Sequence, residues 1–371
     1  MEIPLVDLKR QYQSIKDEVN REFVGVMEKG AFILGENVDL FEKEFAGYCG
    51  VKCGVGVNSG TDALLLSLRA LGICEGDEVI SVPNTFVSTI DAISHNHATP
   101  VLVDIEPETY NIDVTKVEDK ITRKTKAILI VHMYGHPIDM DPLLEVAREN
   151  DLYVVEDASH AHGAEYKGRR VGSLGDCACF SFYPSKVLGA HGDAGIVVTD
   201  DEKLAEEIRL LRNYGEKRKY HHLLIGYNSR LDELQATLLR IKLRYVDKWI
   251  AMRRKNAEMY NRLLHGLSQV IPPTEKRYVK HVYCYYVIRC RDRDELKAWL
   301  IKNGISVSMH YPIPIHLQEC YKHLKYNEGS FPVAEKPAKE ILSLPMFPEL
   351  TDTEIEYVCS NIVEFYEKRQ T

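Results

Sequence analysis

The sequence predicts an α/β fold: a large, mostly parallel sheet with helices on both faces, followed by a small α+β domain. Two observations support this fold class. Short β-branched and apolar runs recur between residues 78 and 199, and several are separated by helical stretches. After about residue 246 the pattern changes to a few strands and helices in mixed order. We therefore expect a large domain at residues 1–245 and a small domain at residues 246–371.

The large domain contains six segments with the composition of buried strands. They are residues 79–82, 101–103, 127–132, 153–155, 177–182 and 196–199. Residues 142–149 carry apolar side chains at helical spacing, which is typical of a crossover helix. In open α/β sheets ligands bind beyond the carboxyl ends of the strands, where Asp157 and Ser181 fall.

The helical pattern continues at residues 201–212 and 229–249, and we expect these helices to lead out of the large domain. In the small domain we expect two strands and three helices. These are a tyrosine-rich strand at 281–289, a helix at 294–303, a strand at 305–309, and helices at 335–342 and 353–367.

Charge and composition exclude several classes of protein. The 371 residues have a net charge of −8 with dispersed basic side chains, so we expect no nucleic-acid or anionic-membrane partner. The start lacks an export signal and no window approaches 18 uncharged apolar residues, which predicts a cytoplasmic protein. Nine cysteines, an odd number, indicate mostly free thiols in a reducing compartment. Their spacing matches no metal template, so we expect no metal site.

Lys186 is the most informative residue of the chain. It lies among small, aromatic and apolar residues, 29 positions after Asp157 at a predicted strand end. Without a local carboxylate to hold its proton, its amine suits carbonyl chemistry, which suggests a Schiff-base lysine. The alternatives are a solvated loop lysine and, for Asp157, a helix cap.

Residues 55–68 are interpreted as a glycine turn that leads into a helix. The first turn of this helix, with Gly60 and Thr61, offers a hydroxyl and free backbone N–H groups to a phosphate. An ordinary N-capped helix is the alternative. A phosphate site, a carboxylate for a heteroaromatic nitrogen and a lysine for an imine are together what pyridoxal 5′-phosphate needs.

These residues and further motifs resemble the DegT/DnrJ/EryC1/StrS family of sugar aminotransferases, a branch of fold-type I pyridoxal-phosphate enzymes. The resemblance runs nearly end to end. It includes the motifs at residues 3–8, 32–35, 59–64, 83–86, 132–135, 156–158, 228–235 and 310–317.

The resemblance implies a role for each matching residue. Lys186 would carry the cofactor imine, Asp157 would pair with the pyridine nitrogen, and Phe86 would lie against the ring. The phosphate would be held by Gly60, Thr61 and Ser181.

Two further positions carry implications. The family's equivalent of Asn228 reaches the phosphate of the neighbouring subunit, which implies a homodimer with shared active sites. His160 departs from the family pattern, which usually has glutamine there. An imidazole can also donate a hydrogen bond, so we expect His160 to contact the cofactor. The alternative is a histidine that supports the site without touching the cofactor.

Retention of Lys186 favours transamination, because some relatives have histidine there and act as dehydratases. The resemblance implies transfer from L-glutamate to a nucleotide-linked keto sugar, and most specifically to C3 of a dTDP-3-keto-6-deoxyhexose. Amination at C4 and UDP-linked 3-keto sugars are alternatives. Expected sugar contacts are Tyr183, His310 and Tyr311, with Arg230 for the diphosphate, although each could be structural.

Two other functions stay open from the residues alone. A cofactor-dependent lyase acting on an amino acid would share Lys186 and Asp157, but would not need the segments 228–235 and 310–312. A regulatory or binding protein could keep the fold without turnover, although the intact lysine and phosphate loop argue against this.

Overall fold

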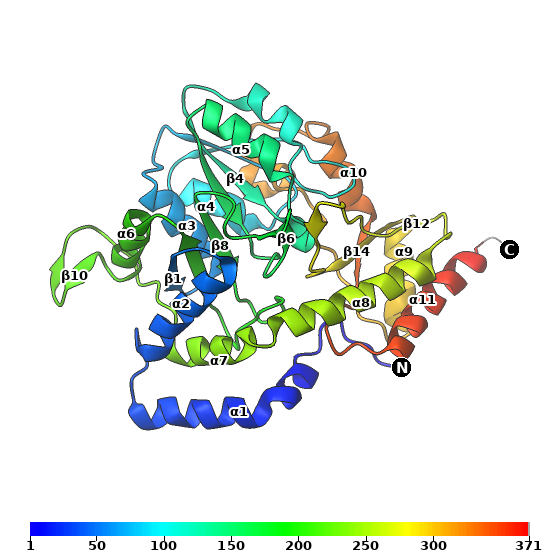
Figure 1. The fold of residues 1–371 in the computed structure, drawn as a ribbon. Helices are drawn as coiled ribbons and strands as arrows, with labels where there is room; N and C mark the ends of the chain where they lie inside the picture. The colour runs from blue at the N-terminus through cyan, green and yellow to red at the C-terminus, as the bar shows by residue number, and fades with distance from the viewer. Residues whose placement is uncertain (370–371) are drawn as a thin grey trace.

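The computed structural model describes residues 1–369 and contains a seven-stranded central sheet (Figure 1). Only β9 runs antiparallel to its neighbours, so the predicted, mostly parallel sheet is confirmed. In spatial order the strands are β1 (Cys53–Val57), β9 (Gly195–Thr199), β8 (Cys177–Ser181), β5 (Tyr153–Asp157), β4 (Thr125–Val131), β2 (Glu78–Ser81) and β3 (Thr99–Leu102).

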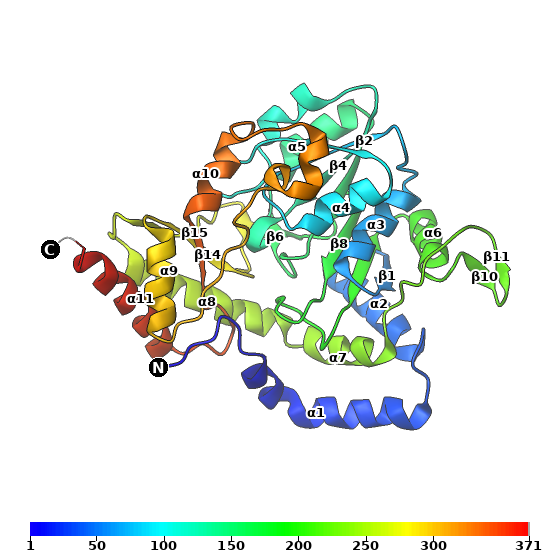
Figure 2. The same cartoon turned by 180° about the vertical axis from the view of Figure 1, so that it is seen from behind.

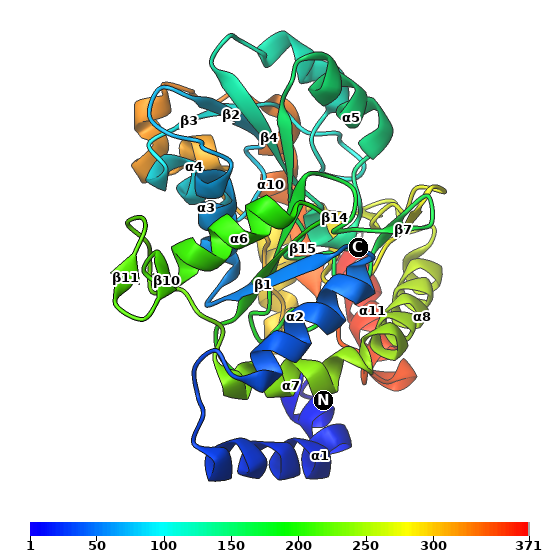
Figure 3. The same ribbon diagram turned by 60° about the vertical axis from the view of Figure 1, so that its left-hand side comes forward.

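Helices cover both faces of this sheet (Figure 3). Continuous apolar strands such as β9, with all five residues buried, are expected when both faces are covered. One face carries α3 (Gly60–Ala70), α4 (Val87–His95) and α6 (Glu202–Arg212), and the other carries α2 (Glu36–Cys49) and α5 (Met140–Glu149). The predicted helices at 142–149 and 201–212 are thereby confirmed.

The interpretation of residues 55–58 as a glycine turn is wrong, because they belong to the edge strand β1 and its exit. The glycines of β1 permit close packing. A Cβ at Gly54 would lie 2.5 Å from the carbonyl oxygen of Glu42, and one at Gly56 would lie 2.9 Å from Leu231. Glycine in this strand therefore allows α2 and the segment before α7 (Glu233–Leu243) to approach the backbone closely. Composition alone does not reveal this approach.

The helix expected at 229–249 is divided in two. The structure has α7 (Glu233–Leu243) and α8 (Val246–Leu264), with a break at Arg244 and Tyr245. The first helix, α1 (Leu8–Lys29), lies against α7 at the bottom of Figure 1. Their shared apolar cluster contains Ile15, Val19, Leu238, Ile241 and Trp249.

The small domain is built on an antiparallel sheet of β12 (Val270–Ile271), β14 (Tyr286–Cys290) and β15 (Ile341–Leu344). Helices α9 (Arg293–Lys302) and α11 (Asp352–Glu367) confirm the helices expected at 294–303 and 353–367. Both termini of the described chain lie at this end of the molecule (Figure 2).

Three expectations for this region need correction. The strand expected at 281–289 includes only the later part as β14, and residues 305–309 contribute isolated bridges rather than a strand. The helix expected at 335–342 is α10 (Pro332–Glu340) in the structure. The last two residues of the expected helix, Ile341 and Leu342, begin β15 instead. The reason is that all four residues of β15 are buried against β14, a tertiary pairing that overrides local spacing.

Short elements complete the fold. The ribbon β6 (Glu165–Tyr166), β7 (Arg169–Arg170) and β13 (Val279–Lys280) forms a second small sheet, and β10 (Glu216–Arg218) and β11 (His221–His222) form a projecting hairpin. All nine cysteines are unpaired, as expected. None of the helices within residues 1–369 has the length and apolarity to cross a membrane.

Two large apolar clusters form the core. The second gathers around α8, α9 and α11 and includes Ile3, which pairs with Ile305, so the N-terminal residues pack on the small domain. Several side chains between 282 and 341 join the first cluster instead. The domain boundary at residues 245 and 246 stays a prediction.

A buried carboxylate fixes the strand end that carries Asp157. Glu156 accepts hydrogen bonds from His132 Nε2 at 2.9 Å and from the N–H groups of Gly172, Leu174 and Gly175 at 3.2, 2.9 and 2.8 Å. Burial raises the pKa of Glu156, but the hydrogen bonds from His132 and the backbone outweigh it and leave the pKa below its ordinary value. The carboxylate therefore remains ionised inside the core.

We expect Glu156→Gln to lower the free energy of unfolding by about 3 kcal/mol. The amide would lack the negative charge that now accepts four hydrogen bonds, and its NH2 group would face N–H donors. Urea unfolding monitored by circular dichroism measures this. The control is Glu165→Gln, whose partly exposed ion pair with Lys280 should contribute under about 1 kcal/mol. Equal effects of the two substitutions would contradict the prediction.

Candidate active site

A cavity of about 480 Å³ opens at the carboxyl ends of β4, β5 and β8 and at the start of α3. It brings together ten of the site residues predicted from the sequence. These are Gly60, Thr61, Phe86, Asp157, His160, Ser181, Tyr183, Lys186, His310 and Tyr311. Strand ends and a helix N-terminus therefore converge where the sheet topology predicts a ligand.

Asp157, the last residue of β5, is 4% exposed and is held by two donors. Thr89 Oγ1 donates to Oδ2 at 2.8 Å, and the N–H of Ser159 donates to Oδ1 at 3.1 Å. Thr85 and Thr89 are linked through their hydroxyls at 2.7 Å. Neither threonine was predicted as a site residue, although Thr85 lies within the 83–86 motif and Thr89 follows it by three residues. Asp157 is therefore a fixed carboxylate at the cavity wall rather than a helix cap.

The N-terminus of α3 lies directly against the end of β8. Ser59 caps the helix by accepting the N–H of Asp62 at 3.1 Å, so the alternative of an N-capped helix is also true of this segment. A Cβ on Gly60 would lie 2.5 Å from Cβ of Ser181. This close approach places Thr61 and Ser181 on the same cavity, where the helix N-terminus favours an anion.

Lys186 follows β8 in the loop that leads to β9, and it is half-buried. Its Nζ lies 5.7 Å from the ring centre of Tyr285. Tyr285 stacks on His310, with ring centres 3.9 Å apart and planes 16° apart. Burial, followed by the nearby Lys186 charge, lowers the pKa of His310 to about 4. The small domain thus supplies an aromatic wall beside the amine, and Tyr285 is a site residue that the sequence analysis missed.

His160 lines the same cavity and is 4% exposed. Its Nδ1 accepts the N–H of Tyr134 at 3.3 Å, which leaves the proton on Nε2. Burial first, and then the charge of Lys186, lower the pKa of His160 well below its ordinary value. The imidazole is therefore a neutral group that can still donate one hydrogen bond, as expected for a replacement of glutamine.

The remaining predicted sugar contacts also line this cavity. His310 Nδ1 lies 2.7 Å from Ser343 Oγ, and the hydroxyl of Tyr134 donates to the His310 carbonyl. Tyr311 packs on Phe86, with ring centres 5.6 Å apart. Tyr183 is 56% exposed, so its hydroxyl and ring are accessible from solvent.

Asn228 and Arg230 do not line the Lys186 cavity. They lie in a neighbouring shallow cavity, which shares only Asp193 with the first. Arg230 donates to Asn213 Oδ1 at 3.1 Å and lies over the Tyr214 ring. Within one chain the structure leaves these two residues apart from the other site residues.

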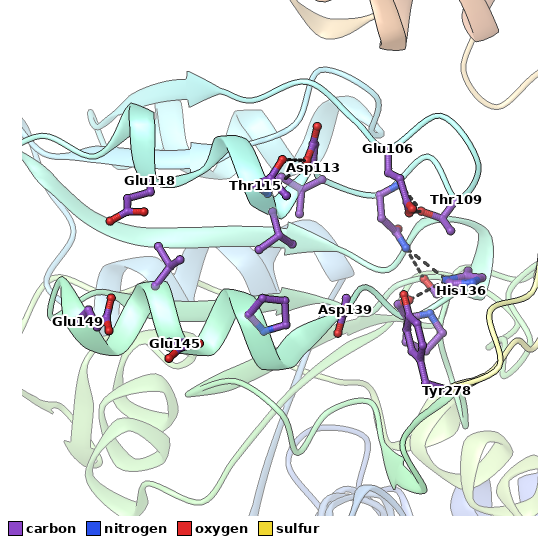
Figure 4. Close-up of a pocket in the computed structure, with 16 residues that line it drawn as sticks. Glu106, Thr109, Asp113, Thr115, Glu118, His136, Asp139, Glu145, Glu149 and Tyr278 are labelled. Carbon is purple, nitrogen blue, oxygen red and sulfur yellow. Dashed lines mark hydrogen bonds between the residues drawn. The ribbon is translucent and has the colours of Figure 1, made fainter.

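A further cavity of about 470 Å³ lies between α5 and the segment before β4 (Figure 4). Glu145 and Glu149 on α5 lie across from Glu118, and His136 lies at the other end. None of the predicted site residues lines it. Across residues 1–369, no three histidine, cysteine or acidic side chains are arranged to hold a metal ion.

Residues 13–363 match the model of the DegT/DnrJ/EryC1/StrS aminotransferase family. The chain belongs to this family. The resemblance stated from the sequence is thereby confirmed, and so is the prediction that the protein is an aminotransferase.

Individual relatives cover almost the whole aminotransferase. A pleiotropic regulatory protein of Geobacillus stearothermophilus is 46% identical over 99% of both chains. A dTDP-3-amino-3,4,6-trideoxy-α-D-glucose transaminase of Streptomyces venezuelae is 44% identical over 99% of this chain and 97% of its own. The crystal structure of S. venezuelae DesV in complex with a ketimine intermediate superposes with a TM-score of 0.96, at 44% identity and 98% coverage of both chains. A protein of Streptococcus pneumoniae described as a sugar aminotransferase has been solved in PMP and PLP forms, which superpose with a TM-score of 0.90 at 26% and 27% identity, over 94% of this chain and 96% of that one.

Proposed function

We propose that the aminotransferase moves an amino group from L-glutamate to C3 of a nucleotide-linked keto sugar, with a dTDP-3-keto-6-deoxyhexose as the preferred acceptor. The observation that carries this proposal is the convergence of Lys186, Asp157 and the N-terminus of α3 in one cavity. The name of the S. venezuelae relative supports the position of amination and the nucleotide.

The cavity has the donor set that pyridoxal 5′-phosphate requires. Gly60, Thr61 and Ser181 would hold the phosphate at the start of α3, where a Cβ on Gly60 would fill the space. The fixed carboxylate of Asp157 would keep the pyridine nitrogen protonated, and Phe86 would lie against the ring. When bound, the cofactor supplies an electron sink for a carbanion at the donor's α-carbon.

The chain's own residues would then handle protons and orientation. The amine of Lys186 would accept the proton from the α-carbon of the amino donor and hold it for the later protonation step. Neutral His160 would donate a hydrogen bond without adding charge, and neutral His310 lines the cavity with Tyr183 and Tyr311. These three side chains would orient the sugar by hydrogen bonds.

Replacing Gly60 with alanine tests the phosphate site. The added methyl group would displace Ser181, and overpacking of this kind opposes binding by about 1–3 kcal/mol, which is roughly a 5- to 160-fold loss of cofactor affinity. Equilibrium dialysis with pyridoxal 5′-phosphate measures the affinity. The control is Gly47→Ala in α2, where a Cβ would meet nothing within 4 Å. An unchanged cofactor affinity in Gly60→Ala would contradict the proposed placement of the phosphate beside Gly60.

We also infer that the enzyme acts as a homodimer with shared sites. Asn228 and Arg230 lie outside the cavity that they are expected to serve, so a second copy could bring them to it. The β10–β11 hairpin projects from the rest of the molecule (Figure 2). This hairpin and the residues after it expose Tyr220, Leu223 and Ile225, the last at 96%. In this assembly Arg230 would meet the diphosphate.

The unpaired cysteines support a cytoplasmic location.

The decisive experiment offers the purified enzyme L-glutamate with each acceptor in turn, followed by NMR of the product. The acceptors are a dTDP-3-keto-6-deoxyhexose, its 4-keto isomer and a UDP-linked 3-keto sugar. A C3 amino sugar formed fastest from the dTDP acceptor supports the proposal, and preference for either other acceptor replaces it with that alternative. Glutamate turnover without transfer to any sugar would favour the lyase, and no turnover at all would favour the regulatory protein.

A further inference from the structure

Helix α7 carries two polar side chains that bind the backbone just after Lys186. Gln235 Oε1 accepts the N–H of His191 at 2.9 Å, and its Nε2 donates to the His191 carbonyl at 3.3 Å. Lys242 Nζ donates to the carbonyl of Gly189 at 2.7 Å. The two side chains are seven residues apart, so they project from the same face of the helix. One face of α7 therefore contacts both ends of the segment 189–191.

This segment closes the loop on which Lys186 sits. The N–H of Ala190 donates to the carbonyl of Phe182 at 2.7 Å, and the N–H of Lys186 donates to the carbonyl of Tyr183 at 2.9 Å. Gly189 lies so close to Pro184 that a Cβ would be 2.3 Å from its carbonyl oxygen. A shift of Gly189 would therefore push directly on the turn that orients Lys186.

Lys242 differs from an ordinary core residue, because it is a basic side chain buried without an acidic partner. Its side chain is fully buried, and it takes part in none of the ion pairs within residues 1–369. Burial lowers its pKa to about 8, with the charge of Glu349 opposing this. Burial of an ammonium group without a carboxylate partner disfavours the folded state. An apolar side chain of similar length could fill the space, so the distinctive contribution of Lys242 is its hydrogen bond to Gly189.

We propose that Gln235 and Lys242 are positioning residues that fix residues 189–191 and thereby orient the Lys186 amine. This inference rests on the proposed function, because the amine is the group that moves the proton. Neither side chain lines the Lys186 cavity of its own chain, so both are placed to act on Lys186 through the loop. Gln235 also lines the neighbouring cavity with Asn228 and Arg230, whereas Lys242 does not. Helix α7, which begins within the 228–235 motif, would in this way set the geometry of the reaction.

The test compares Lys242→Met and Gln235→Met with wild-type enzyme in two measurements. The first is the single-turnover rate with L-glutamate, which depends on the orientation of Lys186. A displaced catalytic group commonly lowers such a rate by about 100-fold, and we expect about 10- to 100-fold here. The second is the Kd for pyridoxamine 5′-phosphate, which binds without a covalent bond to Lys186 and should be unchanged.

Arg240→Met is the matched control, because Arg240 lies on the same helix but pairs with Glu44 away from the loop. Rates in both test variants that equal the wild-type rate would overturn the proposal. Equal losses in all three variants, or a parallel loss of pyridoxamine 5′-phosphate affinity, would show a general disturbance of α7 and also overturn it. If Lys242→Met does not fold, the partly exposed Gln235→Met carries the test. A wild-type enzyme without turnover would instead contradict the proposed function.

Discussion

Lys186→Ala will lose amino transfer by at least about 10³-fold, because the same amine both bonds the cofactor and moves the proton. The half-reaction with L-glutamate, followed by the change in cofactor absorbance, measures this loss directly. The variant should still bind pyridoxamine 5′-phosphate, since the proposed phosphate donors at Gly60, Thr61 and Ser181 are untouched.

Two controls separate charge from chemistry at this position. Lys186→Arg keeps a positive charge beside Tyr285 but cannot form the same bond, so it should be as inactive as Lys186→Ala. Lys167→Ala removes an exposed lysine paired with Asp141, outside the cavity, and should leave the rate unchanged. An active Lys186→Ala enzyme would place the chemistry on another residue.

Asp157→Asn should lower the rate of the same half-reaction by about 10²–10³-fold. The amide has the shape of the carboxylate but no negative charge, so it would no longer favour a protonated pyridine nitrogen. Single-turnover absorbance with L-glutamate measures the rate, and the spectrum of the bound cofactor reports the ring's protonation.

Thr89→Val gives the graded comparison for this prediction. It removes the hydrogen bond to Asp157 Oδ2 but keeps the charge, so the loss should be only about tenfold. Asp113→Asn alters a carboxylate of the cavity beside α5, which none of the predicted site residues lines, and should leave the rate of the half-reaction unchanged. A loss in Thr89→Val as large as that in Asp157→Asn would mean that the position of the carboxylate, rather than its charge, is decisive.

The strands of the central sheet were predictable because their chemistry is local. Continuous β-branched and apolar runs such as 127–131 and 196–199 identify strands buried on both faces without knowledge of their neighbours. The exception is β1, where glycines are needed because Glu42 and Leu231 approach the backbone. Local composition cannot reveal such a contact between distant segments.

The amino-acid sequence by itself determined the chemistry of this protein. Lys186, Asp157 and the Gly60-Thr61 turn have intrinsic reactivity, charge and hydrogen-bonding capacity, and their order along the chain is specific enough to indicate the cofactor and family. These properties belong to the residue types, so they can be recognised before any fold is known.

Only the tertiary structure decided which groups support that chemistry. Thr89 beneath Asp157, Tyr285 beside Lys186, and the contacts of α7 with residues 189–191 join segments far apart in the chain. A threonine, a tyrosine or a buried lysine has no local pattern that distinguishes such a role from ordinary packing. Their positions depend on long-range contacts, because burial and hydrogen bonding are determined by neighbours that the local sequence does not specify.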